Sequence, residues 1–342
     1  MSSIAEQHHA LTPGRERATL LTLSAVQFTH ILDYMIMMPL GAQLMKVFSI
    51  SPAQFTHLVA AYGVSAGVFG LAGGFVLDRF DRKRSLLFLY TGFGIATLAC
   101  ALAPNHVALL VARVFAGAFG GLAGSMVTAM VGDIIPPARR GRAMTYIMAA
   151  FPLASVLGVP LGIYLVADHG WHAPFFLLAA CSALVLPVAI FALPPIKTAV
   201  HNHEPLKQMR EILSRGIHLR AFAVSAMLVV AGGILIPFIA PSYIINAGIN
   251  EQKLITVYMI GGLATAATTP LVGWLSDHMD RLKLLTIMSV AASVVAVVIT
   301  HMGPSSFAYG AFMMACFMVT MSSRFSPAMA MVANAVESRY RG

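Results

Sequence analysis

A single carboxylate lies in the middle of a long apolar segment. The segment covers residues 18–43, and Asp33 is the only acidic residue near the centre of such a segment in this chain. Removal from water disfavours the charged form of a carboxylate, so Asp33 is suited to bind and release a proton. His30 lies one helical turn away on the same helix face, where it could share or relay that proton. The alternative is that Asp33 pairs with a cation only to hold helices together.

Arg113 is the obvious cation for Asp33. It lies inside a second apolar segment, residues 106–134. A nearby positive charge favours the ionised carboxylate, and withdrawal of that charge favours the protonated form. We therefore expect Asp33 and Arg113 to form a switch between proton-loaded and proton-free forms, with a buried structural arginine as the alternative.

Another group of charged residues occurs twice. The pattern G-x-x-x-D-x-x-D-R covers residues 74–82 and recurs 199 positions later, at residues 273–281. The two copies comprise Gly74, Asp78, Asp81 and Arg82, with Arg79 and Lys83 beside them, and Gly273, Asp277, Asp280 and Arg281. Such a duplication between apolar segments is typical of transporters built from two related halves. Asp133, at the end of the segment 106–134, is the predicted partner of Arg82.

The composition indicates an all-α polytopic membrane protein. The chain is 58% hydrophobic and 10% charged, against about 25% charged residues in an ordinary soluble domain. Ten apolar segments can be marked, each near the roughly 20 residues that cross the hydrocarbon as a helix. They cover residues 18–43, 53–77, 84–103, 106–134, 144–167, 173–194, 219–247, 253–276, 282–301 and 305–336.

The cations predict the orientation of these spans. With the N-terminus in the cytoplasm, all but four of the 22 Lys and Arg residues fall on the inner side. Lys46 and Lys253 fall outside, and Arg113 and Arg324 fall within spans. The net charge of +9 thus reflects membrane topology, and we expect no nucleic-acid partner.

The longest inner connection divides the chain. We expect a cytoplasmic tail at residues 1–17, a six-helix bundle at 18–194, a cytoplasmic linker at 195–218 and a partial bundle of four helices at 219–342. The linker holds His201, His203 and Glu204, but no further ligands stand nearby, so a solvated loop is favoured over a metal site.

Several of these motifs resemble those of the major facilitator superfamily, and the resemblance covers essentially the whole chain. Residues 74–83 are similar to its motif A, with Asp81 where a glycine is usual. Residues 113–117 resemble motif B, R-x-x-x-G, with Arg113 as the arginine. Gly158, Pro160 and Gly162 resemble motif C, which the family associates with antiporters, although Val159 interrupts the usual Gly-Pro pair.

The resemblance implies a fold of two six-helix bundles and a role for each motif. Motif A, with Asp133, would latch the bundles in the outward-facing state, or else act only as a topological anchor. Motif C would allow close helix packing and a local bend that seals the cavity, or else serve packing alone. Tyr34, Met37 and Arg324 are weaker candidates for lining a substrate cavity.

The implied function is proton-coupled efflux of a small molecule, such as a drug, sugar or metabolite, by alternating access. The pattern is most similar to the 12-span drug/proton antiporter and sugar-efflux branch, so we expect a monomer in a bacterial cytoplasmic membrane. The proton motive force would supply the energy, with no cofactor, no metal and no enzymatic activity. The alternatives are a proton-independent facilitator or symporter of a metabolite, or a non-transporting membrane sensor or scaffold on the same fold.

The repeat also predicts that the second half of the chain is incomplete. Residues 131–141 align with residues 332–342, which places the last residue at the loop that follows the fourth span of the first half. We expect the chain to be truncated after its tenth span, with a ten-span variant as the alternative.

Overall fold

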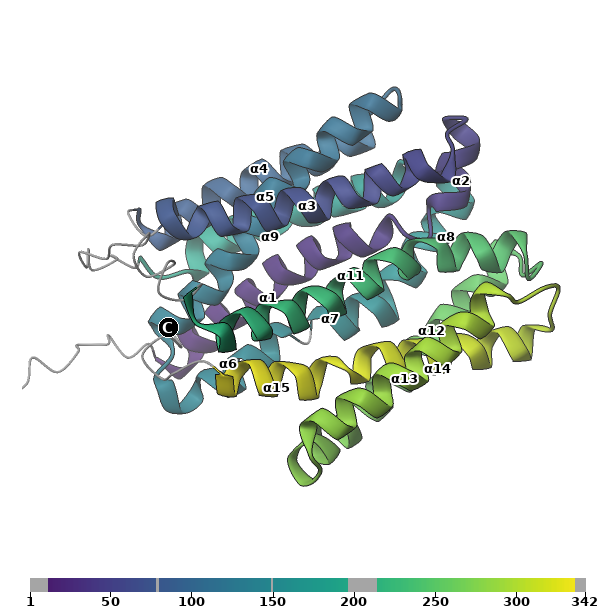
Figure 1. Cartoon of the computed structure of the whole chain (residues 1–342). Helices are drawn as coiled ribbons and strands as arrows, with labels where there is room; N and C mark the ends of the chain where they lie inside the picture. The colour runs from purple at the N-terminus through teal and green to yellow at the C-terminus, as the bar shows by residue number, and fades with distance from the viewer. Residues whose placement is uncertain (1–11, 78–79, 149, 196–213, 336–342) are drawn as a thin grey trace, which may run out of the picture. The chain divides into compact units, whose positions relative to one another are not determined.

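The structure is a computed structural model, and it describes residues 12–77, 80–148, 150–195 and 214–335 (Figure 1). Within these ranges the chain is helical and contains no strand. The first half holds α1 (Pro13–Ile36), α2 (Gly41–Val47), α3 (Pro52–Val76), α4 (Arg82–Ala101), α5 (His106–Ile134), α6 (Pro137–Met148), α7 (Ala150–Leu153), a π-helix η2 (Ala154–Gly158), α8 (Val159–His169) and α9 (Ala173–Ala192). The second half holds α11 (Gly216–Ile245), α12 (Glu251–His278), α13 (Arg281–Thr300), α14 (Phe307–Ser323) and α15 (Phe325–Ala335).

Each predicted apolar segment coincides with helix, but not every segment is one helix. Among the described residues, seven helices are long and apolar enough to cross a membrane. The number is eight if α1 and α2, which bend by 58° at a short break, form one span. The fifth segment is divided among α6, α7, η2 and α8, and the tenth between α14 and α15.

A proline lies at or beside each of these helix breaks, although prolines also occur inside the unbroken helices α9, α11 and α12. Proline has no backbone N–H, so it cannot donate to the carbonyl four residues earlier in a helix. Pro39 lies in the break between α1 and α2, and Pro327 follows the break between α14 and α15. Pro160 is the second residue of α8, the helix that follows the π-helix η2. A hydrophobic segment of span length therefore locates a helical region but does not show where the helix within it is interrupted.

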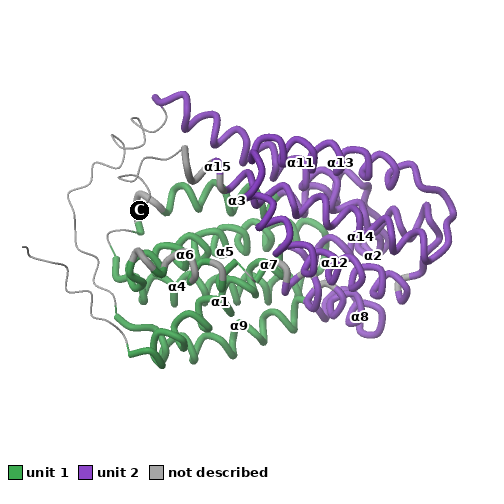
Figure 2. Tube along the Cα trace, turned by 90° about the horizontal axis from the view of Figure 1, so that it is seen from below, with its two compact units in different colours: residues 1–34, 61–151, 175–201 green, residues 35–60, 152–174, 202–342 purple. Residues whose placement is uncertain are grey.

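The described residues group into two compact units (Figure 2). The first takes its residues from the ranges 1–34, 61–151 and 175–201, and the second from 35–60, 152–174 and 202–342. These units do not follow the predicted domain boundaries, because residues 35–60 and 152–174 group with the second half of the chain. The division into two sequential bundles stays a prediction.

Within the first unit, glycines bring α5 close to α3. A Cβ atom added at Gly117 would collide with the backbone of Tyr62, and one added at Gly121 would collide with Ala66. Small residues at such positions allow helix backbones to approach closely. This contact places Tyr62 beside the middle of α5, which matters for the site described below.

Within the second unit, glycines allow similar close contacts. A Cβ atom on Gly262 of α12 would lie 2.8 Å from Val156 of η2. A Cβ atom on Gly41 of α2 would lie 2.9 Å from the ring of Phe55 and 3.0 Å from Pro241 of α11. The packing of this unit therefore depends on residues without side chains at several helix crossings.

Candidate functional site

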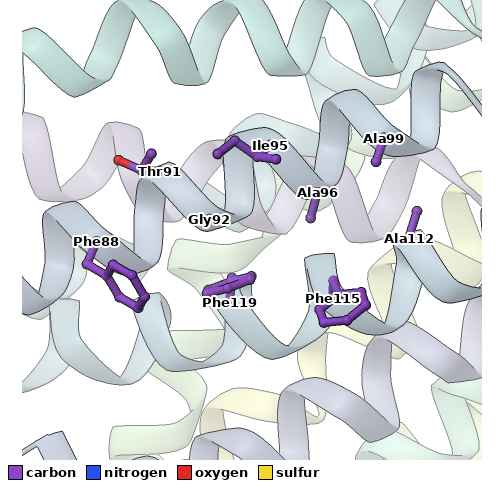
Figure 3. Close-up of a pocket in the computed structure, with 9 residues that line it drawn as sticks. All are labelled: Phe88, Thr91, Gly92, Ile95, Ala96, Ala99, Ala112, Phe115 and Phe119. Atoms are coloured by element: carbon purple, nitrogen blue, oxygen red, sulfur yellow. The ribbon is translucent and has the colours of Figure 1, made fainter.

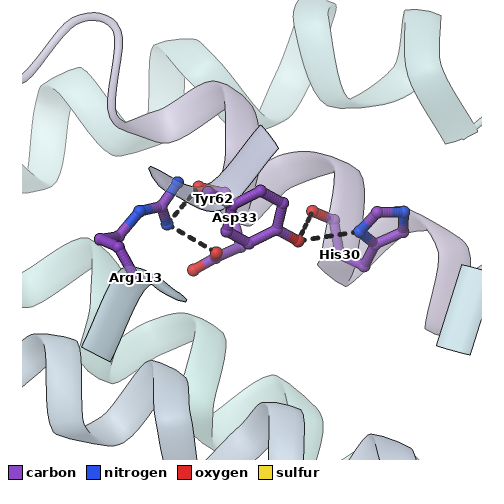
Figure 4. Close-up of polar contacts among 4 residues, drawn as sticks. All are labelled: His30, Asp33, Tyr62 and Arg113. Carbon is purple, nitrogen blue, oxygen red and sulfur yellow. Dashed lines mark hydrogen bonds and ion pairs between the residues drawn. The ribbon is translucent and has the colours of Figure 1, made fainter. Parts of the chain in front are cut away.

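A buried ion pair joins α1 and α5. Arg113 Nη1 lies 2.7 Å from Asp33 Oδ2, and both side chains are completely buried (Figure 4). Arg113 Nη1 also donates to the backbone oxygen of Asp33 at 3.2 Å. Asp33 lies in the last turn of α1, where backbone carbonyls have no partner within the helix. The end of α1 at this point thus leaves the Asp33 carbonyl as a second acceptor for Arg113. Asp33 and Arg113, which the sequence analysis paired, are in direct contact in the structure.

The hydrogen-bonding capacity of this ion pair is only partly used. Asp33 Oδ1, Arg113 Nε and Arg113 Nη2 are buried and have no hydrogen-bond partner among the described residues. A buried pair normally compensates its desolvation through additional hydrogen bonds. Asp33 Oδ1 is therefore an open acceptor that could take a proton while Oδ2 keeps its contact with Arg113.

Tyr62 of α3 contacts both Arg113 and His30 (Figure 4). The Arg113 guanidinium lies 4.4 Å from the centre of the Tyr62 ring, a distance typical of a cation–π interaction. The Tyr62 hydroxyl lies 2.8 Å from His30 Nδ1 and donates to the His30 backbone oxygen at 3.1 Å. The sequence did not single out Tyr62, because a tyrosine in an apolar segment has no feature that ties it to residues on other helices.

His30 is half-buried and lies against the glycines of α5. A Cβ atom on Gly120 would lie 3.2 Å from His30 Nδ1, and one on Gly124 would lie 3.1 Å from His30 Nε2. The ring of His30 therefore occupies space that α5 provides by lacking side chains there. Of the predicted proton-handling residues, Asp33 and Arg113 are in direct contact, and His30 meets them through Tyr62.

The predicted cavity residues are distributed over both units. Tyr34, in the first unit, is half-buried and its ring centre lies 5.7 Å from that of Tyr62. Met37 and Arg324 belong to the second unit, where both are buried. A substrate cavity that these residues share stays a prediction.

Part of the predicted motif A cluster falls in the described region. Arg82 Nε lies 3.0 Å from Asp133 Oδ2, so Arg82 contacts the partner expected for it. Lys83 follows Arg82 in the first turn of α4. Asp78 and Arg79 lie outside the described residues, as do His201, His203 and Glu204 of the linker. Gly74 lies in α3.

The second aspartate of each repeat begins a helix. Asp81 accepts a hydrogen bond from the Arg84 backbone N–H at 2.8 Å, and Asp280 accepts one from Lys283 at 2.8 Å. Both are N-cap residues, of α4 and α13 respectively. Aspartate is among the best N-cap residues because its carboxylate binds an unpaired N–H of the first turn. The shared Asp-Arg of the repeat is therefore a helix start in both halves.

The remaining repeat residues surround the start of α13. Gly273 and Asp277 lie in α12, and Arg281 is the first residue of α13, with Nε 3.4 Å from the backbone oxygen of Ser276. A Cβ atom on Gly273 would meet no atom of the described structure within 4 Å. Close packing therefore does not require a glycine at this position.

The motif C residues lie at a change of helix type. Gly158 ends the π-helix η2, and Pro160 lies in the first turn of α8. A Cβ atom on Gly162 would collide with the side chain of Ile36, the last residue of α1. The π-helix interrupts the regular α-helix before Pro160, and Gly162 lets Ile36 approach closely. The role of motif C in sealing a cavity stays a prediction.

A cavity in the first unit is separate from these polar residues. It measures about 380 Å³ and lies between α4 and α5, against the aromatic rings of Phe88, Phe115 and Phe119 (Figure 3). Gly92 and Ala96 also line it. No predicted site residue contributes to this apolar cavity. Across the described ranges, no group of three His, Cys, Asp or Glu side chains could hold a metal ion.

Comparisons with known proteins agree with this architecture. The chain is 30% identical over 182 residues to the uncharacterized MFS-type transporter YceJ of Bacillus subtilis, which covers 53% of this chain and 45% of that protein. It is 24% identical over 210 residues to Multidrug resistance protein 2 of Bacillus subtilis, covering 60% of this chain and 52% of that protein. The chain thus matches about half the length of these relatives.

The fold matches solved transporter structures over a greater length. A bacterial homologue of the human lysosomal transporter Spinster, in an inward-facing and unoccupied conformation, superposes with a TM-score of 0.75 at 16% identity. The match covers 97% of this chain and 78% of that one. The family model described as Major Facilitator Superfamily matches residues 23–342. The chain is therefore a member of the major facilitator superfamily.

Proposed function

We propose that this protein exports a small organic molecule in exchange for protons by alternating access. The observation that carries the proposal is the fully buried Asp33–Arg113 pair, which keeps one carboxylate oxygen without a partner among the described residues. Charged groups inside a membrane are costly and are associated with ion pathways and proton relays. The pair joins two membrane-length helical segments, so its making and breaking can be coupled to helix movement.

Protonation of Asp33 would alter the balance of charge around Arg113. A proton on Asp33 Oδ1 neutralises the carboxylate and leaves the buried guanidinium without a counter-ion. Such an uncompensated charge costs several kcal/mol, on the order of 3–5 kcal/mol by analogy with broken buried pairs. The protonated protein would therefore favour a conformation in which Arg113 reaches water or another acceptor, and the deprotonated protein would favour the closed pair.

Two of the matched relatives are named for drug resistance or efflux, and the names of the relatives differ in substrate. The chain is 24% identical to Multidrug resistance protein 2 of Bacillus subtilis and 26% identical to a probable sugar efflux transporter of Mannheimia succiniciproducens. It is also 30% identical over 162 residues to a gallate transporter of Pseudomonas putida. We propose efflux of a drug, sugar or related metabolite as the substrate class, with a monomer in a bacterial cytoplasmic membrane and the N-terminus inside.

The motif A and motif C residues receive supporting roles in this proposal. The Arg82–Asp133 pair, with Asp78 and Arg79, would steady the cytoplasmic ends of the spans during the conformational cycle. The π-helix and Gly162 would let the fifth span bend and pack closely. Tyr34, Met37 and Arg324 would contribute to the substrate cavity, and no cofactor is needed because the proton gradient supplies the energy.

Everted membrane vesicles test the proposal. A proton gradient is formed, and cationic drugs, sugars and aromatic acids are added in turn while a pH-sensitive dye reports release of protons from the lumen. We expect release with one class of compound, loss of that release in Asp33→Asn, and an unchanged response in Asp168→Asn, which alters an exposed carboxylate at the end of α8. Labelled substrate that equilibrates equally in wild type and Asp33→Asn, without proton release, would show a facilitator instead.

A further inference from the structure

Tyr62 contacts both Arg113 and His30, and the proposed proton exchange assigns no role to these contacts. Its ring lies against Arg113, and its hydroxyl meets His30 at two atoms, Nδ1 at 2.8 Å and the backbone oxygen at 3.1 Å. Figure 4 shows Tyr62 between the two residues, with Arg113 on one side and His30 on the other. One side chain thus contacts two of the three residues predicted to handle the proton.

The two contacts of the hydroxyl determine which nitrogen of His30 carries a hydrogen. A phenolic hydroxyl has one proton to donate, and a backbone carbonyl can only accept. Both contacts are hydrogen bonds only if Tyr62 donates to the His30 carbonyl and His30 Nδ1–H donates to the Tyr62 oxygen. Neutral His30 is then the Nδ1–H tautomer, and its Nε2 lone pair is the remaining place for a proton.

The surroundings of Nε2 provide room and an acceptor. Gly124 leaves open the position where a Cβ atom would lie 3.1 Å from His30 Nε2 and 3.6 Å from Gln27 Oε1. Gln27 Oε1 is buried and has no hydrogen-bond partner among the described residues. Both atoms therefore border the same small space beside α5. A proton added to Nε2 would point into a region that already holds an unused acceptor.

We propose that Tyr62 is a positioning residue that holds His30 in its Nδ1–H tautomer, so that Nε2 accepts the proton, and that steadies Arg113 through its ring. The same hydrogen bonds persist when Nε2 is protonated, because Nδ1 donates in both states. Besides His30, the titratable groups around Tyr62 in the described structure are Asp33 and Tyr34 on α1, Cys100 on α4 and Arg113 on α5. The relay function of His30 rests on the proposed proton coupling, but the tautomer assignment does not.

The tautomer can be measured directly by ¹⁵N NMR of protein labelled at histidine and reconstituted in bilayers. The chain has 12 histidines, and a His30→Gln variant identifies the signals of His30 by their loss. We expect an Nδ1–H signature for His30 at neutral pH in wild type. Tyr62→Phe keeps the ring but removes the hydroxyl, and we expect His30 to revert to the Nε2–H tautomer that free imidazole side chains prefer.

Tyr90→Phe is the matched control. Tyr90 is a buried tyrosine whose hydroxyl lies 3.0 Å from Thr29 Oγ1, on the residue next to His30 in α1. Its removal deletes a comparable hydrogen bond to the same helix without touching the imidazole, so the His30 signals should stay as in wild type. An Nε2–H signature in wild type, or an Nδ1–H signature that survives Tyr62→Phe, would overturn the assignment.

Transport measurements separate the two parts of the proposal. Tyr62→Phe should change the pH profile of transport while leaving the KM for substrate near the wild-type value, whereas Tyr62→Leu should also lower the maximal rate because Arg113 loses the ring beneath it. A pH profile identical to that of wild type in Tyr62→Phe would refute a positioning role in proton transfer. If Asp33→Asn keeps full proton coupling, the proposed function fails even where the NMR result for Tyr62 holds.

Discussion

At the scale of single residues, the proposed proton exchange rests on four side chains of the first unit. Asp33 and Arg113 form a fully buried ion pair, the Tyr62 ring packs against the guanidinium, and the His30 imidazole contacts the Tyr62 hydroxyl. A charged residue in an apolar segment is conspicuous in a sequence, so Asp33 and Arg113 could be predicted. Tyr62 could not, because its importance arises only when Gly117 lets α3 approach α5.

The coupling between Asp33 and Arg113 is expected to be large. Arg113→Met removes one partner of a fully buried pair and should destabilise the protein by about 3–5 kcal/mol, since it leaves a buried carboxylate uncompensated. Combining it with Asp33→Asn should cost less than the sum of the single changes. Denaturant unfolding in detergent micelles gives the free energy of unfolding of the two single variants and the double variant. Arg84→Met, which alters an exposed arginine of α4, serves as the control. Additive effects would mean that the pair contributes no coupling.

Gly124 offers a second residue-scale prediction. In Gly124→Ala the new methyl group would lie 3.1 Å from His30 Nε2, within the space that a proton on Nε2 needs. We expect proton-coupled transport to fall in this variant. Gly132→Ala, in the same helix, meets no atom within 4 Å and should transport normally. It should also be slightly more stable, by up to about 1 kcal/mol, because alanine favours helix over glycine. Equal transport by both variants would argue against proton access beside Gly124.

At the scale of secondary-structure elements, each copy of the repeated pattern contains the N-terminus of a helix. Asp81 and Asp280 cap α4 and α13 with nearly the same geometry. The sequence showed that residues 74–82 correspond to residues 273–281. That Asp78 and Asp277 belong to clusters of charged residues stays a prediction. Capping could have been anticipated, because an aspartate just before a helical segment is a common N-terminal signal.

The caps can be tested separately from any role in conformational change. Asp81→Ala and Asp280→Ala should each destabilise the protein by about 1 kcal/mol, within the range of 0.5–2 kcal/mol for lost caps. Asp81→Asn and Asp280→Asn should retain most of the stability, because asparagine caps almost as well. Thermal unfolding compares the four variants. If the asparagine variants were as unstable as the alanine variants, the negative charge rather than the cap would be the stabilising feature.

The positions at which helices are interrupted could not be predicted from the sequence. Ten apolar segments located the helical regions well, because hydropathy depends on composition that the sequence displays directly. The breaks near Pro39 and Pro327 and the π-helix beside Pro160 were not placed, since prolines are tolerated inside membrane helices when neighbours satisfy the freed backbone groups. Whether a proline bends or breaks a span depends on packing, which the sequence does not specify.

At the scale of the whole molecule, the sequence predicts the membrane class and the family but not the substrate. Low charge and long apolar segments predicted an all-α membrane protein, and the resemblance of motifs A, B and C pointed to the major facilitator superfamily, which the family match over residues 23–342 confirms. Substrate choice depends on the shape of a cavity lined by several helices. Residues such as Tyr34 and Met37 are ordinary in an apolar chain and gave only a weak signal.

The most direct test of the central claim is proton release on substrate binding by the purified protein. The protein is placed in lightly buffered detergent solution at a pH where Asp33 is proton-loaded, and the substrate found with everted vesicles is added while an indicator dye reports pH. We predict that wild type and Asp168→Asn release protons in proportion to bound substrate, whereas Asp33→Asn binds substrate and releases none. Equal proton release from Asp33→Asn and wild type would contradict the assignment of Asp33 as the coupling site.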